Sequence, residues 1–105
     1  MPAYAVVTMS IHDPETYRKY TALTPALVKR HGGKFLTRGG EVFTQEGQEF
    51  TERMVILEFP SKAHFDAMYS DPEYVEAVKF RHAASTSRLL VQESPSDVEN
   101  PQPNV

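Results

Sequence analysis

The stretch Arg-Met-Val-Ile-Leu-Glu-Phe at residues 53–59 is the strongest strand signal in the chain and decides the fold. Successive side chains of a strand point to opposite faces of a sheet. The two faces of this strand carry Val55, Leu57 and Phe59 on one side and Met54, Ile56 and Glu58 on the other. A sheet with helices on one side and water on the other alternates apolar and polar residues. Two mostly apolar faces therefore predict a sheet that is covered on both sides.

Further strands are predicted before and after this stretch. Apolar alternation predicts a first strand over residues 3–11. We expect a short strand over residues 34–38 and a last strand over 85–93, which carries Leu89, Leu90 and Val91. We also expect a second short strand over residues 41–45.

Three helices are predicted between the strands. Asp13-Pro14-Glu15 and Asp71-Pro72-Glu73 are helix starts, because an Asp side chain accepts hydrogen bonds from free amides and proline suits the first helical position. Ser61 is a natural N-cap for the helix between them. The order of strands and helices predicts an α+β fold of the ferredoxin-like split β-α-β type, with one antiparallel sheet and helices on one face.

The length and composition indicate one globular domain. The chain has 105 residues, of which 40% are hydrophobic and 24% charged, and its formal net charge is -3. We assign residues 1–93 to the domain and expect the acidic, proline-rich tail of residues 94–105 to be mobile. The near-neutral body has no basic cluster, so we expect no nucleic-acid partner.

Several other classes of protein are also not expected. The chain has no cysteine, which excludes disulfides and thiolate chemistry. Its apolar runs are far shorter than the ~20 residues that span a bilayer. The N-terminus lacks the basic, apolar and small-residue pattern of an export signal. We therefore expect a cytoplasmic protein without a membrane partner.

The second apolar face of the sheet predicts a homodimer. The first strand repeats the two-faced pattern more weakly, with Tyr4 and Val6 on its second face, and the chain has no spare helix to cover them. A second copy can cover this face by sheet-to-sheet packing around a two-fold axis. The alternative is a monomer with an exposed apolar patch, which globular proteins rarely tolerate when it is large.

Four blocks of sequence carry a family likeness. They are His31-Gly32-Gly33-Lys34-Phe35-Leu36-Thr37-Arg38-Gly39-Gly40, Arg53-Met54-Val55-Ile56-Leu57-Glu58-Phe59-Pro60-Ser61, Met68-Tyr69-Ser70-Asp71-Pro72-Glu73-Tyr74 and Arg81-His82-Ala83-Ala84-Ser85-Thr86-Ser87-Arg88-Leu89. In this order they resemble the uncharacterised family called domain of unknown function 1330, and the likeness spans about residues 2–93. The resemblance implies the dimeric α+β barrel superfamily, whose members include cofactor-free monooxygenases, muconolactone isomerase-like enzymes and haem proteins. It implies no particular reaction.

Glu58 is the candidate catalytic residue. It ends the otherwise apolar second face of its strand, where a carboxylate is costly unless it is paired. One hypothesis makes it an acid or base, with a pKa raised by desolvation, at the mouth of a cavity between helices and sheet or inside the barrel. The alternative, which we prefer, is a structural ion pair with Arg38 or Arg81.

The candidate substrate-binding residues are two arginines and two tyrosines. Arg38 precedes Gly39-Gly40, glycines that allow close backbone approach or a turn with positive φ. Either Arg38 or Arg81 can hold a carboxylate ligand with two hydrogen bonds. Tyr20 and Tyr74 belong to an aromatic set, completed by Tyr17 and Tyr69, that lines a cavity or simply forms core.

No metal or cofactor is predicted. No pair among the four histidines has the spacing of a helical zinc site. His82, on a late helix that we expect to face the sheet, is the one histidine placed for axial haem ligation, and no further haem signature accompanies it.

The leading functional hypothesis is a small cofactor-free enzyme of the monooxygenase or isomerase kind. Its substrate would be small, partly apolar, and anionic or carbonyl-bearing. The alternative is a non-catalytic ligand-binding or stress-related dimeric module, in which an ion pair fully occupies Glu58. Function on this fold depends on the site rather than on the fold itself.

Overall fold

A computed structural model describes residues 1–95 of the chain. Residues 96–105, most of the tail predicted to be mobile, lie outside this range. The elements in order are β1 (Ala3–Ile11), α1 (Pro14–Arg30), β2 (Lys34–Arg38), β3 (Arg53–Phe59), α2 (Lys62–Tyr69), α3 (Pro72–Ala84) and β4 (Ser85–Glu93). No helix in the described part of the chain has the length and apolar character needed to cross a membrane.

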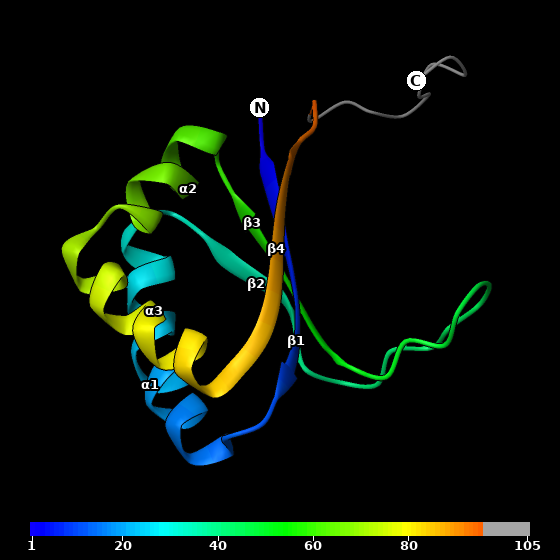
Figure 1. The fold of residues 1–105 in the computed structure, drawn as a ribbon. Helices are drawn as coiled ribbons and strands as arrows, with labels where there is room; N and C mark the ends of the chain where they lie inside the picture. Colours follow the sequence, from blue (N-terminus) through cyan, green and yellow to red (C-terminus); the bar gives the residue numbers. More distant parts are fainter. Residues whose placement is uncertain (96–105) are drawn as a thin grey trace.

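The four strands form one antiparallel sheet in the order β2-β3-β1-β4. All three helices lie on the same side of the sheet (Figure 1). The predicted α+β, ferredoxin-like topology is thereby confirmed. Because β1 and β3 each have a neighbour on both sides, their faces form the centre of the sheet.

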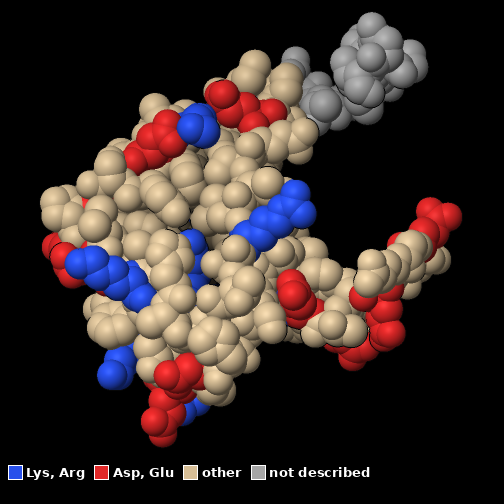
Figure 2. All heavy atoms as spheres, viewed as in Figure 1, with Lys and Arg blue, Asp and Glu red and all other residues tan. Residues whose placement is uncertain are grey.

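The second short strand expected over residues 41–45 is not formed. Residues 39–52, here called the arm, leave the sheet between β2 and β3 without helix or strand (Figure 1). The physical reason is that β3 already pairs with β2 and β1, so no free edge of β3 remains for these residues. Acidic side chains gather on the arm (Figure 2).

The helix starts are the ones that the sequence predicts. The Asp13 carboxylate accepts a hydrogen bond from the amide of Thr16 at 3.2 Å, and Asp71 accepts one from the amide of Glu73 at 2.9 Å. The Ser61 hydroxyl accepts one from an amide at the start of α2. These side chains satisfy amides that the first turn of a helix leaves free.

The end of α1 depends on two glycines. Gly32 has φ +77°, a conformation that glycine adopts without a steric penalty, and the Gly33 amide donates to the Val28 carbonyl at 2.9 Å. A Cβ added at Gly33 would lie 2.5 Å from Cε1 of Phe59, a fully buried ring. The chain therefore needs glycine here so that β3 can pack against the end of α1.

The core lies between the helices and one face of the sheet. This face carries Ala5, Val7 and Met9 of β1 and Val55, Leu57 and Phe59 of β3. Tyr74 of α3 is the largest of the almost fully buried side chains that pack against it.

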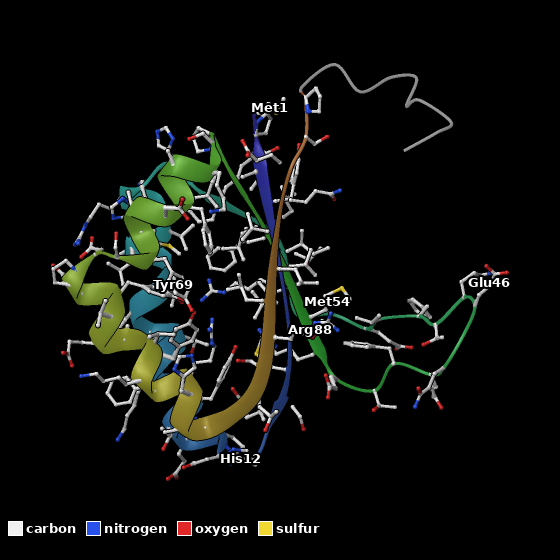
Figure 3. The ribbon with its side chains drawn as sticks, turned by 45° about the horizontal axis from the view of Figure 1, so that its top comes forward. Met1, His12, Glu46, Met54, Tyr69 and Arg88 are labelled. Carbon is white, nitrogen blue, oxygen red and sulfur yellow. The ribbon has the colours of Figure 1, made fainter. Side chains whose placement is uncertain are left out.

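The opposite face of the sheet, here called the open face, is not covered by any helix or strand of residues 1–95 (Figure 1). Register places Ile56, Val6 and Leu90 side by side across β3, β1 and β4, and Leu90 is 55% exposed. Met54 and Arg88 point away from the helices on this face, toward the side where the arm extends (Figure 3). A row of apolar side chains thus remains exposed to solvent in a single protomer.

Gly33→Ala tests the close packing of α1 against β3. The new methyl group must displace the Phe59 ring, so we expect a loss of about 1–3 kcal/mol in the free energy of unfolding, measured by urea denaturation. Adding Phe59→Leu should make the combined loss smaller than the sum of the two single losses, because the ring atoms in the way are gone. An unchanged urea midpoint for Gly33→Ala would contradict the packing described here.

Asp71 gives the fold a defined pH dependence. A hydrogen bond with His31 at 2.8 Å, the amide of Glu73 and the guanidinium of Arg30 lower the pKa of Asp71 to about 2. Since this pKa lies below the ordinary value of 3.8, the ionised carboxylate stabilises the folded state above about pH 4, and that stabilisation is lost as the pH falls toward 2. The difference in urea midpoint between wild type and Asp71→Asn should shrink over this range. Asp66→Asn, which removes an exposed carboxylate, is the control.

Candidate functional site

A cavity of about 50 Å³ lies between the helices and the inner face of the sheet. Its lining is mostly apolar, and the charged residues in it are all arginines: Arg38, Arg53 and Arg81. No acidic residue of the described chain lines it. A predominantly apolar hollow with a few convergent polar groups is the usual form of a small-molecule site.

Arg81 is the most unusual residue of this cavity. It projects from α3 and is only 3% exposed. Its Nη1 donates to the hydroxyls of Tyr20 and Tyr74, both at 3.3 Å, and its Nε is buried without a partner. No carboxylate of the described residues pairs with it. Because an unpaired buried charge is strongly destabilising, this guanidinium is poised for an anion that residues 1–95 do not provide.

Tyr20 and Tyr74 complete a polar cluster with Arg81. Their hydroxyl oxygens lie 2.9 Å apart, and their rings meet edge to face. Burial raises the pKa of Tyr74, so its hydroxyl remains protonated at neutral pH and can serve as a hydrogen-bond donor. Three of the four residues predicted to bind substrate thus meet at one place.

Arg38 reaches the cavity because β2 is irregular. The register shifts between Phe35 and Thr37, so Phe35 and Arg38 pair with Leu57 and Val55, two residues of the inner face. The Arg38 guanidinium lies 4.6 Å from the centre of the Phe35 ring and donates to the backbone carbonyl of Thr21 at 3.4 Å. Since Arg38 is exposed and also lines the cavity, it marks the mouth.

Arg53 is a lining residue that the sequence analysis missed. Its Nε is buried without a partner in the described part of the chain. A signal was present in the sequence, because Arg53 shares the odd-numbered face of β3 with the core residues Val55 and Leu57. Nearby, the Tyr17 hydroxyl donates to the sulfur of Met9 at 2.8 Å, and burial raises the pKa of Tyr17.

Glu58 lies on the open face, not in the cavity between helices and sheet. Its Oε1 is 3.2 Å from Nζ of Lys34. In the pairing of β1 with β3, Tyr4 lies opposite Glu58. The expected ion pair with Arg38 or Arg81 is therefore wrong, because alternation along β3 turns Glu58 away from both. The Lys34 ammonium and the Tyr4 hydroxyl lower the pKa of Glu58, where the catalytic hypothesis required a raised one.

The cavity is equipped to donate hydrogen bonds and to hold negative charge. Its arginines and tyrosine hydroxyls supply donors, and among the described residues no carboxylate or histidine lines it as a base. His82, expected to face the sheet, is exposed on the outer side of α3. Within residues 1–95, no three acidic or histidine side chains come together as they would around a metal ion.

Comparisons with known proteins agree with this architecture. The family model described as domain of unknown function (DUF1330) matches residues 2–94. A protein of unknown function from Rhodopseudomonas palustris is 29% identical over 90% of this chain and 83% of its own, with a TM-score of 0.76. No curated protein matches the sequence.

Two more distant structures share the fold. SnoaB from Streptomyces nogalater, described as a cofactor-independent oxygenase, is 17% identical over 94% of this chain and 98% of its own, with a TM-score of 0.64. A dimeric ferredoxin-like protein of unknown function from Jannaschia sp. CCS1 is 13% identical over 90% of this chain and all of its own, also with a TM-score of 0.64. At these identities the likeness establishes the fold alone.

Proposed function

We propose that this chain, which belongs to the DUF1330 family, binds a small, partly apolar anion in the cavity beside Arg81. The observation that carries the proposal is the buried Arg81 guanidinium, which has no acidic partner in the described residues. A planar guanidinium matches a carboxylate in geometry and can hold it with two parallel hydrogen bonds.

The rest of the cavity supports the same class of ligand. Tyr20 and Tyr74 stand beside Arg81 and add hydroxyl donors, and Arg38 provides positive charge at the mouth. The apolar lining favours a hydrocarbon portion. Because sites for drug-sized ligands measure roughly 300–1,000 Å³, a cavity of about 50 Å³ suits a much smaller molecule.

An enzymatic use of the same site is the second candidate. The shared fold with a cofactor-independent oxygenase supports it by analogy. In such an enzyme the cavity donors would stabilise the negative oxygen of an enolate or phenolate, which is the electrostatic role that preorganised donors play in catalysis. The proposal places the binding of that oxygen on Arg81, with Tyr20 and Tyr74 beside it. We assign no proton transfer to Glu58, which stands on the other face of the sheet.

Arg81→Met tests the anion site. The wild type should gain thermal stability from small carboxylates such as propionate and butyrate, and not from propionamide and butyramide, which lack the charge. Hydrogen bonds to charged groups contribute about 1.5–3 kcal/mol, so Arg81→Met should weaken carboxylate binding about 10- to 100-fold in calorimetric titrations. Without ligand, the variant should unfold at the same or a higher temperature, because an unpaired buried charge has been removed.

Two controls separate this effect from general loss of charge. Lys79→Met removes a positive charge from the exposed side of the same helix, and Glu58→Gln neutralises the carboxylate on the open face. Both variants should bind carboxylates as the wild type does. Equal binding of carboxylates and amides, or wild-type affinity in Arg81→Met, would refute the anion site, while weaker binding in Glu58→Gln would return that residue to the site.

We further propose that the protein forms a homodimer by packing the open faces of two sheets together. The side chains of Val6, Ile56 and Leu90 form the apolar centre of such an interface, and the rows on either side of them are mostly polar. Structural neighbours described as dimeric and ferredoxin-like support a dimer of this kind. Two copies related by a two-fold axis would cover each other's apolar row.

Ile56→Lys tests the open face as the interface. A charge at the centre of the buried face costs about 3 kcal/mol or more, which corresponds to about a hundredfold or greater rise in the dimer Kd. Analytical ultracentrifugation should therefore show monomers at concentrations where the wild type is dimeric, with an unchanged circular dichroism spectrum. Val75→Lys, which alters an exposed valine on the helical side, should remain dimeric. A dimeric Ile56→Lys variant would rule out this interface.

A further inference from the structure

The arm is separated from the body of its own protomer. It projects from the ends of β2 and β3 on the side of the sheet opposite the helices, and Glu46 lies at its tip (Figures 1 and 3). Gly39 and Gly40, with φ +100° and +99°, turn the chain out of β2 at its root. One hydrogen bond joins the two limbs of the arm: the backbone amide of Phe50 donates to the Thr44 hydroxyl at 2.7 Å.

The arm carries an apolar side chain that its own protomer does not cover. Phe43 is 78% exposed, the largest exposed fraction among the large apolar residues of the described chain. A long connection without regular structure is uncommon in a compact domain and is usually functional when ordered. An exposed aromatic ring on such a connection is a feature of protein interaction surfaces.

The charge of the arm complements the rest of the protomer. Four acidic residues, Glu41, Glu46, Glu49 and Glu52, lie in the arm, and all eleven Lys and Arg residues of the chain lie outside it. None of these four carboxylates has an ion pair within the described residues. On the open face, toward which the arm extends, Arg88 is exposed and likewise has no ion pair in that part of the chain.

We propose that the arm of each protomer crosses onto the body of a second copy, buries Phe43 there and places its glutamates near basic residues of that copy. This inference rests on the proposed open-face dimer, because sheet-to-sheet packing puts the second copy on the side where the arm projects. A two-fold axis provides two equivalent crossings, one from each protomer. The negative charge of the arm and the positive charge of Arg88 on the open face then favour the contact in both directions.

A single cysteine tests the crossing directly, because the chain contains none. Phe43→Cys, labelled with a maleimide benzophenone and irradiated at a concentration where the protein is dimeric, should give a covalent dimer on a denaturing gel. Val75→Cys, which places the same label on an exposed valine of α3, should not. Adding Ile56→Lys to the labelled Phe43→Cys chain should abolish the covalent dimer.

Ultracentrifugation of the same labelled samples distinguishes failure of the arm crossing from failure of the open-face dimer. If the protein is dimeric but Phe43→Cys forms no intermolecular product, the arm does not cross, and the open-face dimer still stands. If the protein is monomeric, the dimer proposal fails and the crossing fails with it. As an independent measurement, Phe43→Ser should raise the dimer Kd about tenfold or more, as loss of an aromatic anchor does, and an unchanged Kd would overturn the role of this ring.

Discussion

The rest of the structure depends on the two-faced character of the central strands, β1 and β3. Their inner faces carry the side chains that hold the three helices, and this packing creates both the core and the cavity. Their other faces carry a second apolar row, and no helix of the described residues covers it. One strand pattern therefore creates two surfaces, an internal one for the proposed small ligand and an external one for the proposed second copy.

The contacts of the Arg81 guanidinium partly offset the cost of burying its charge in the cavity. Within residues 1–95 no carboxylate pairs with Arg81, but two tyrosine hydroxyls and the face of the Tyr20 ring, 5.5 Å away, surround its guanidinium. Such contacts satisfy some donors and leave the charge itself unneutralised. A site built in this way is less stable when empty than a fully apolar core would be, and an incoming anion gains the interaction that the protein lacks.

Much of this architecture is predictable from sequence, and the errors have physical reasons. The helix caps at Asp13 and Asp71, the order of strands and helices along the chain and the two apolar faces follow from local patterns. Alternation along residues 53–59 also places Arg53 on the inner face and Glu58 on the outer one, which is incompatible with the expected ion pair between Glu58 and Arg38 or Arg81. The irregularity of β2 that turns Arg38 toward the cavity has no such signal, because it arises from pairing with β3.

The arm shows how the proposed ligand site and the proposed dimer are linked. It begins directly after Arg38 and ends directly before Arg53, two of the three arginines that line the cavity. At its root, a Cβ on Gly39 would come within 3.0 Å of the Arg53 guanidinium, so the backbone there packs directly against one of these arginines. A second copy that holds the arm would therefore also restrain the backbone beside the anion site. In this arrangement, assembly of the dimer and order at the mouth of the cavity depend on the same segment of chain.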